Sequence, residues 1–290
     1  MNKAPLIQPK RNQQQNDSAP EDRTLRPTVF WRIAEDIPDR LRWVLMGLSI
    51  AIPFLFWWIF SNSGWVKPLF LPTPAKVFSA IAHLWATGDL LKDIFASLYR
   101  VLMGFALAAT ISIPLGTVMG SFASVRSLLE PMIAILRYMP APAFIPLLIL
   151  YFGVGETTKI LLIFLGILFY NTLMVMDGVK FVPKELIETS YTLGARRPQI
   201  IWQVIFPYIL PTIIDAARVN IAAGWNLVIV SELVAATEGL GRRIIVAQKF
   251  LKTDEIFAGL IVIGIIGLSI DLFFRFLLRL TCAWASHENR

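Results

Sequence analysis

The sequence predicts an all-α integral membrane protein of about six transmembrane helices. Hydrophobic residues make up 56% of its 290 residues and charged residues only 16%, whereas a soluble domain carries about 25% charged residues. Uncharged stretches such as 43–66 and 101–125 are long enough for the roughly 20 residues that cross a bilayer as a helix. Together these observations exclude an ordinary soluble enzyme and a wholly disordered chain.

The scarcity of cysteine and histidine excludes several kinds of site. Cys282 is the one cysteine of the sequence, so neither an intrachain disulfide nor a cysteine-rich zinc or iron–sulfur site is expected. His83 and His287 are too few for a histidine-based metal centre. The net charge of +7 would suggest nucleic acid in a soluble protein. Here the basic residues are typical of cytoplasmic loops, and no nucleic-acid partner is expected.

Residues 1–42 differ from the rest and are expected to form a cytosolic N-terminal tail, followed by a transmembrane domain over 43–290. The tail is rich in Pro, Asn and Gln and lacks an apolar stretch, which argues against a cleaved signal peptide. Residues 29–42 fit either an amphipathic helix on the bilayer surface or a plain linker. Lys and Arg are concentrated in segments that are cytosolic when the N-terminus is inside, which predicts that orientation.

Six spans follow from the uncharged stretches. Their expected bounds are 43–60, 101–125, 131–152, 160–176, 209–235 and 256–280. Prolines prevent a regular helix in the third span, and irregular backbone at membrane depth tends to line a cavity. The stretch 198–235 would accept one span or two by hydropathy. One span from 209 is preferred, because an amphipathic segment that ends at Pro207 precedes it.

The cytosolic segment 184–207 carries the most specific pattern. Glu185 and Glu188 suit the start of a helix, where the helix dipole favours acidic side chains. Gly194 can adopt positive φ and is expected to end that helix. A second short helix should then complete the segment. Such a helix–glycine–helix unit would form a rigid projection, suited to docking in a partner's groove.

This segment resembles the cytosolic motif of the permease subunits of type I binding-protein-dependent ABC importers, E-A-A-x-x-x-G followed after nine residues by I-x-L-P. Here Glu188-Thr189-Ser190 is followed after three residues by Gly194, and after nine more by Val204-Ile205-Phe206-Pro207. Threonine, serine and phenylalanine are mild departures from the motif. The resemblance assigns coupling to the ATPase to Glu185, Glu188, Thr189, Ser190, Gly194, Ala195 and Arg196.

Further motifs extend the resemblance over about 65–280, to the subgroup that imports nitrate, bicarbonate, sulfonates and taurine. They are Leu71-Pro72-Thr73-Pro74, Arg100-Val101-x-x-Gly104-Phe105, Ile113-Pro114-Leu115-Gly116, Arg137-x-x-Pro140-x-x-Ala143-x-x-Pro146, Phe152-Gly153-x-Gly155 and Ala223-x-Trp225-x-x-x-x-x-x-Glu232. General similarity puts nitrate first as the expected substrate. Bicarbonate, sulfonate and taurine are alternatives on the same fold.

The resemblance implies a multi-pass protein of the inner membrane, in contact with lipid, in which two copies form the pore. Two cytosolic ATPase subunits would bind ATP–Mg and dock on segment 184–207, and an external solute-binding protein would deliver the substrate. The sequence contains no G-x-x-x-x-G-K-[ST] loop. The chain is therefore expected to be a transport subunit with no ATPase site, catalytic residue, metal or cofactor of its own.

Charges and prolines within the spans give the candidates for a substrate path. These are Arg137, Met139, Pro140, Pro142, Trp225 and Glu232. Arg137, beside the proline-rich break, would either attract an anion or anchor its helix at the lipid headgroups. Glu232 would either pair with Arg242 or Arg243 or belong to an outer gate.

Two other classes of function fit the composition less well. A secondary transporter or channel that needs no ATPase would require an ion-coupling or filter cluster inside the membrane, and the sequence lacks paired acids at mid-span. A membrane enzyme would require clustered His, Asp or Glu at the membrane surface. The two distant histidines argue against it.

Overall fold

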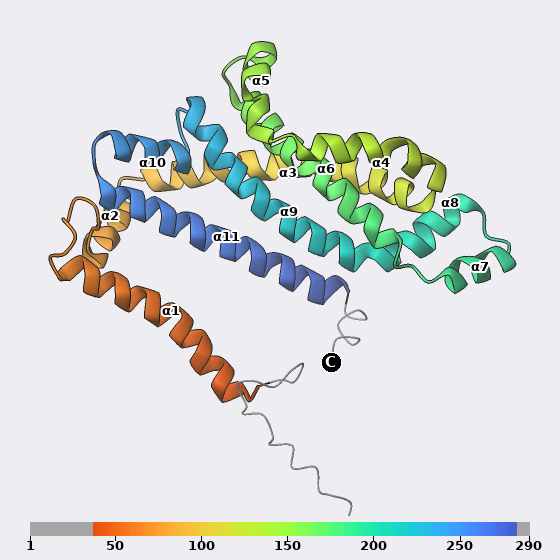
Figure 1. The fold of residues 1–290 in the computed structure, drawn as a ribbon, viewed down its shortest axis with the longest axis horizontal. Coiled ribbons are helices and arrows are strands. Elements are labelled where there is room, and N and C mark those ends of the chain that lie inside the picture. Colours follow the sequence, from red (N-terminus) through yellow and green to blue (C-terminus); the bar gives the residue numbers. More distant parts are fainter. Residues whose placement is uncertain (1–36, 283–290) are drawn as a thin grey trace, which may run out of the picture. The chain divides into compact units, whose positions relative to one another are not determined.

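The computed structural model describes residues 37–282, and all regular elements within that range are helices (Figure 1). In chain order they are α1 (Asp39–Asn62), α2 (Pro74–Ala86), α3 (Asp89–Ser121), α4 (Ala123–Tyr138), η2 (Ala141–Phe144), α5 (Ile145–Phe152), α6 (Glu156–Val179), α7 (Lys184–Thr192), α8 (Arg197–Ile200), η3 (Ile201–Ile205), α9 (Phe206–Ala235), α10 (Leu240–Lys249) and α11 (Thr253–Thr281). The chain divides into two compact units at residues 55 and 56.

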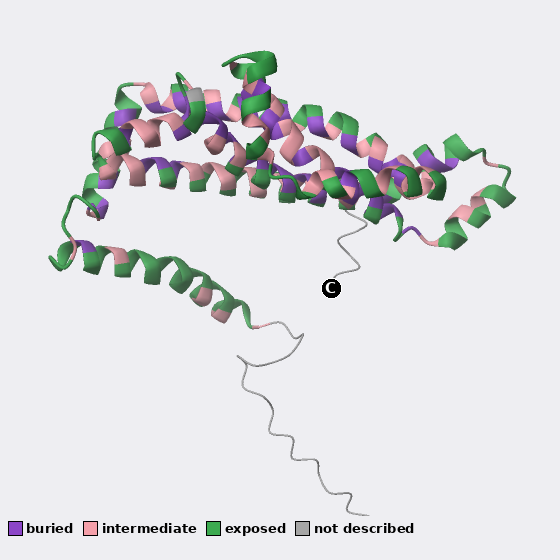
Figure 2. Ribbon diagram, turned by 45° about the horizontal axis from the view of Figure 1, so that its top comes forward, coloured by how far each residue is buried: buried purple, intermediate pink, exposed green. Residues whose placement is uncertain are grey.

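The first unit contains the N-terminal part of α1 within its described residues. This part is apolar and its side chains are largely exposed, as Figure 2 shows, which is typical of a helix that faces lipid. The predicted tail 1–28 and residues 29–36 lie outside the described residues. Residues 39–42 form the first turn of α1, so that part of the segment 29–42 belongs to the first span.

The second unit is built around α3, α6 and α9, which pack along one another. Glycines on α3 allow the close approach of α6. A Cβ added at Gly116 would lie 2.5 Å from the carbonyl oxygen of Thr172, and one at Gly120 would lie 2.5 Å from Cβ of Val179. These small residues therefore serve packing between helices of the same chain.

Within residues 37–282, five helical segments are long and apolar enough to cross a membrane: 39–62, 89–121, 156–179, 197–234 and 253–281. They correspond to five of the six predicted spans, but most are longer than predicted. The second starts at Asp89 instead of 101, because the charged residues Asp93 and Arg100 are buried with partners inside the bundle and do not end the helix. The all-α membrane fold is thus confirmed.

The third predicted span, 131–152, is not a single helix. Helix α4 and the segment Ala141–Phe152, which consists of η2 and α5, meet at a bend of 87°, so they form either one broken span or a re-entrant segment. The bend occurs at Met139, whose ψ of 119° is extended. The residue before a proline is driven out of the helical region, and Pro140 follows directly. The expectation that prolines prevent a regular helix here is confirmed.

The predicted boundary at Pro207 is wrong. The helix continues from α8 through the π-helical turn η3 into α9, as a single apolar segment over 197–234. Within η3 the N–H of Phe206 donates to the carbonyl of Ile201, five residues earlier. This wider turn lies directly before Pro207, where the regular hydrogen-bond ladder would otherwise be interrupted. The choice of one span instead of two is confirmed.

Candidate functional site

A cavity of about 600 Å³ lies where α4 breaks, between the α4–η2 connection, α6 and α9. Its wall is mostly apolar and aromatic, with a few polar side chains. The lining residues are Leu136, Arg137, Tyr138, Met139, Pro140, Ala141, Phe144, Leu165, Gly166, Phe169, Tyr170, Met174, Val219, Asn220, Ala223, Asn226 and Leu227. A concave apolar site with a few placed polar groups is the usual form of a small-molecule site.

Arg137 is the charged residue of this wall. It lies in the last turn of α4, and its Nη2 donates to the hydroxyl of Tyr138 at 3.2 Å, with the guanidinium carbon 5.0 Å from the centre of the Tyr138 ring. The ion pairs within residues 37–282 do not include Arg137. Its positive charge is therefore available to an anion in the cavity.

The structure brings together three of the six residues predicted for the substrate path. Arg137, Met139 and Pro140 line the cavity, whereas Pro142 is exposed in η2. Trp225 lines a second cavity of about 260 Å³ between α9 and α11, and its Nε1 donates to the carbonyl of Ile263 at 3.2 Å.

Glu232, the sixth of these residues, is fully enclosed and bonded to Arg100 instead of Arg242 or Arg243. The Arg100 Nη1 donates to Glu232 Oε1 at 2.6 Å, and Ser97 donates to the same oxygen at 2.7 Å. On its other side Arg100 holds Glu156 with two bonds of 2.5 and 2.8 Å. Glu156 also accepts from Lys159 at 2.9 Å. Two cations and two carboxylates thus form a balanced cluster that joins α3, α6 and α9.

The same cluster fixes the connection to α10. The N–H of Gly241 donates to Glu232 Oε2 at 2.7 Å, and the N–H of Gly239 donates to Asp93 at 2.8 Å. Asp93 also pairs with Arg243. A Cβ at Gly239, whose φ is +128°, would lie 2.4 Å from the Glu232 carboxyl carbon. Only glycine leaves room for the buried carboxylate beneath this turn.

Sequence reasoning missed the role of Arg100 in this cluster, although a signal was present. Asp93, Ser97 and Arg100 follow one another at intervals of four and three residues, which places them on one face of a helix. The pattern was missed because charged residues were expected to mark the ends of the apolar span.

A second buried polar chain crosses the same three helices and reaches the large cavity. Asn171 on α6 donates to Ser112 on α3 at 2.6 Å and accepts from Asn220 on α9 at 3.0 Å. All three residues are at most 3% exposed, and Asn220 lines the cavity. Sequence reasoning also missed this chain, because neutral amides and hydroxyls do not interrupt an apolar pattern.

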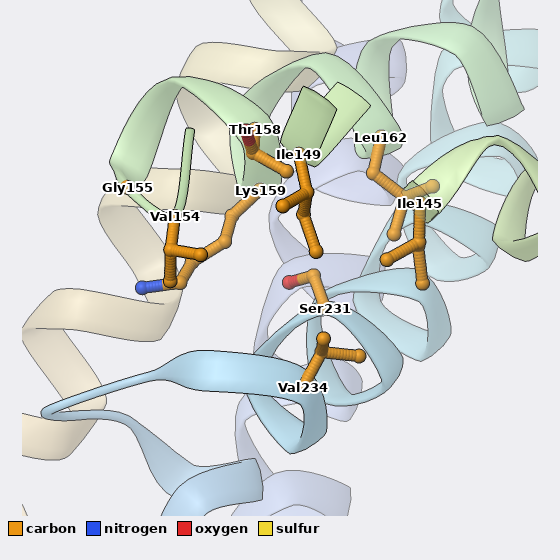
Figure 3. A pocket seen from close by; sticks show the side chains of 9 residues that line it. All are labelled: Ile145, Ile149, Val154, Gly155, Thr158, Lys159, Leu162, Ser231 and Val234. Carbon is orange, nitrogen blue, oxygen red and sulfur yellow. The ribbon is translucent and has the colours of Figure 1, made fainter. Parts of the chain in front are cut away.

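A smaller pocket between α5, the start of α6 and the end of α9 has a different character. Its volume is about 20 Å³, room for roughly one water. Figure 3 shows apolar side chains such as Ile145 and Ile149 around it, while Lys159 extends its ammonium group away from them. This ammonium belongs to the Glu156 cluster, so the pocket reflects packing and not a solute site.

The predicted docking segment has the expected helix–glycine–helix form. Helix α7 ends at Thr192, and Gly194, whose φ is +83°, forms the turn that follows. The N–H of Ala195 donates to the carbonyl of Ser190 at 3.0 Å, and that of Gly194 to Tyr191 at 2.9 Å, the two bonds that define a Schellman cap. After it, the N–H of Arg196 donates to the side chain of Gln199 at 2.8 Å, which opens α8.

The side chains of this segment are available for contact. Glu185, Glu188 and Thr189 are exposed, and no residue of α7 is buried. Ser190 and Thr192 turn their hydroxyls back to carbonyls four residues earlier, at 2.6 and 3.0 Å. Helix α7 therefore offers a free surface on a rigidly capped unit.

Comparison with known families identifies the chain. Residues 112–281, which include the docking segment and the cavity residues of α6 and α9, match the family described as the binding-protein-dependent transport system inner membrane component. The chain belongs to this family. It is therefore a permease subunit of an ABC importer, a multi-pass inner-membrane protein whose ATPase is a separate subunit. Membership also implies a solute-binding protein as a partner.

Individual relatives support the assignment along most of the chain. The permease is 36% identical over 241 residues to the taurine transport system permease protein TauC of Escherichia coli, covering 81% of this chain and 88% of that protein. It is 32% identical over 249 residues to the putative aliphatic sulfonates transport permease protein SsuC of Bacillus subtilis, covering 85% and 90%.

The fold agrees with a solved importer. The permease matches a chain of the inward-facing MetNI methionine ABC transporter with a TM-score of 0.61 and 20% identity, over 68% of this chain and 97% of that chain. At this level of identity the match supports the type I permease fold alone.

Proposed function

We propose that the permease imports a small organic sulfonate, and that two copies of it form the pore with two ATPase subunits and an external solute-binding protein. The observation that carries the proposal is the unpaired Arg137 on the wall of the 600 Å³ cavity. The sulfonate class is favoured by the similarity to permeases named for taurine and aliphatic sulfonates. This reverses the order given by the sequence, which put nitrate first.

Arg137 suits a sulfonate because the guanidinium presents a planar fork of donors to two oxygens of one anionic group. The surrounding wall is largely apolar, and low dielectric strengthens the attraction. One unpaired cation per subunit would concentrate anions near the break in α4 without holding them tightly. Rapid release is needed for transport, so most of the selectivity would belong to the solute-binding protein.

The cytosolic unit around α7 would transmit the motion of the ATPases. Its exposed helix ends in a capped turn at Gly194, and its second part continues through η3 into α9 without a break. A displacement of α7 would therefore be carried directly into a helix that lines the cavity. ATP–Mg would be bound by the ATPase subunits, and the N-terminus would lie on the same, cytosolic side.

Uptake by the reconstituted complex tests the proposal. The permease, its ATPases and its solute-binding protein are placed in proteoliposomes, with labelled taurine, ethanesulfonate, nitrate and bicarbonate as separate substrates. ATP-dependent uptake of a sulfonate is expected. Uptake of nitrate or bicarbonate without any sulfonate would refute the substrate class. Uptake at the same rate without ATP would indicate a secondary transporter or channel.

A further inference from the structure

The buried chain Ser112–Asn171–Asn220 has a fixed direction of hydrogen bonding. The side-chain nitrogen of Asn220 lies 2.8 Å from the carbonyl oxygen of Ala216 and 3.0 Å from the side-chain oxygen of Asn171. A backbone carbonyl only accepts, so the Asn220 atom that faces Ala216 must be the NH₂ group. Reversing the amide would set two carbonyl oxygens against each other at 2.8 Å. The peptide backbone of α9 therefore determines which way Asn220 points.

The oxygen of Asn220 is left without a donor. Both hydrogens of its NH₂ group are used within the protein, with the sulfur of Met174 at 3.3 Å as a further neighbour. Within residues 37–282 no group donates a hydrogen bond to Oδ1 of Asn220. Every fully enclosed side-chain oxygen in that range does have a hydrogen-bond partner, so Oδ1 cannot be fully enclosed. This oxygen is therefore accessible, although Asn220 as a whole is only 3% exposed. Asn220 lines the large cavity, and this is the side from which a solute could reach its oxygen.

The cavity thus has two complementary recognition elements. Arg137 offers hydrogen-bond donors and positive charge, whereas Asn220 offers a neutral acceptor that cannot rotate to become a donor. A carbonyl oxygen does not attract an anion, but it does attract an N–H or O–H group, most strongly a cationic one. An unmet acceptor in an apolar wall also disfavours a substrate that brings only methyl groups to it.

We propose that Asn220 is a specificity-determining residue of the permease, which accepts a hydrogen bond from an ammonium or hydroxyl group carried by the same sulfonate whose anionic end Arg137 attracts. The substrate class is then an amino- or hydroxyalkanesulfonate, in preference to a plain alkanesulfonate. Asn171 and Ser112 are positioning residues that hold the Asn220 amide in place. This inference rests on the proposed sulfonate import.

The test compares two sulfonates that differ in one group. Taurine carries an ammonium where 1-propanesulfonate carries a methyl, and each is supplied on saturated solute-binding protein to the complete complex in proteoliposomes. Asn220→Leu and the smaller Asn220→Ala both remove the acceptor. We expect taurine uptake per assembled complex to fall roughly 10-fold, the size of one hydrogen bond to a charged group, while 1-propanesulfonate uptake stays near the wild-type rate. Asn171→Leu disturbs the same buried chain but keeps the Asn220 oxygen, and should change the ratio of the two rates less.

The outcomes separate the inference from the proposed function. Unchanged taurine uptake in both Asn220 variants overturns the inference, as does an equal fall for both sulfonates, which would make the chain purely structural. The inference is also overturned if Asn171→Leu changes the ratio of taurine uptake to 1-propanesulfonate uptake more than the Asn220 variants do. If the wild-type complex imports neither sulfonate, the proposed function fails and this inference fails with it.

Discussion

Arg100 and Glu232, which are 132 residues apart in the sequence, form an ion pair of 2.6 Å with side-chain exposures of 3% and 0%. The pair lies where α3 meets the end of α9, and Arg100 also binds Glu156 on α6 and the carbonyl of Glu238. One guanidinium therefore holds three helices and the turn that leads to α10. This arrangement gives the first of four predictions.

Replacing Arg100 by Met should strongly destabilise the permease. Glu232 would be left charged and enclosed without its cation, a loss that typically costs about 3–5 kcal/mol. Thermal unfolding of the purified protein measures the effect. Adding Glu232→Gln to the same chain should restore part of the stability, because it removes the uncompensated charge. Arg275→Gln, which breaks the exposed pair with Asp271, is the control and should change little. Equal effects of Arg100→Met and Arg275→Gln would contradict the assignment.

Replacing Gly194 should weaken coupling through the strained backbone and not through crowding within this chain. A Cβ at Gly194 meets no atom within 4 Å, but φ of +83° costs an ordinary L-residue about 1–2 kcal/mol. Gly194→Val should therefore lower transport-coupled ATPase activity while the permease remains in the membrane. Gly194→Asn should retain most activity, since Asn tolerates this conformation. Wild-type activity of Gly194→Val in proteoliposomes would remove the turn from the coupling role.

Reversing the charge of Glu188 should weaken assembly with the ATPases. The side chain is exposed on α7, and the ion pairs within residues 37–282 do not include it, so it is free to meet a partner. We expect Glu188→Lys to reduce the amount of ATPase that co-purifies with the permease. Lys67→Glu, a reversal of equal size in the exposed α1–α2 connection, serves as the matched control. Full co-purification with Glu188→Lys would place this residue outside the interface.

Neutralising Arg137 should slow transport without affecting assembly. Arg137→Gln removes the positive charge of the cavity and should lower sulfonate uptake several-fold, whereas Arg137→Lys keeps the charge but loses the planar fork and should be intermediate. Labelled uptake, normalised to assembled complex, gives the comparison. Because Arg137 also donates to the Tyr138 hydroxyl, Tyr138→Phe, which keeps the ring under the guanidinium, tests whether the loss of that hydrogen bond alone matters. A residue that only anchors α4 at the headgroups would tolerate Gln with little change.

Local chemistry made part of the structure readable from the sequence. Pro140 forces the preceding Met139 out of helical geometry, and this alone predicts the break beside which the cavity lies. Gly194 adopts a positive φ that terminates α7, and this depends on the glycine itself and not on its tertiary surroundings. Both predictions concern a residue and its immediate neighbours, so they do not depend on how the helices pack.

Long-range partners were not readable in the same way. In the sequence, Arg100 is a charged residue at the edge of an apolar stretch, and only the folded structure shows its partners Glu156 and Glu232. The predicted start of the second span was wrong for that reason. The helix through Pro207 likewise depends on a wider turn over Ile201–Ile205 that no local rule demands.

The sequence by itself determined the membrane class, five of the apolar segments, the capped docking unit and the family, because hydropathy, turn chemistry and motif spacing are properties of neighbouring residues. The tertiary structure decided which polar groups meet inside the bundle. It placed Arg137 on a cavity, enclosed Glu232 together with Arg100 and put Asn220 on the wall of the same cavity. Buried polar groups are stable only with partners, and in this permease those partners come from helices that are distant in sequence.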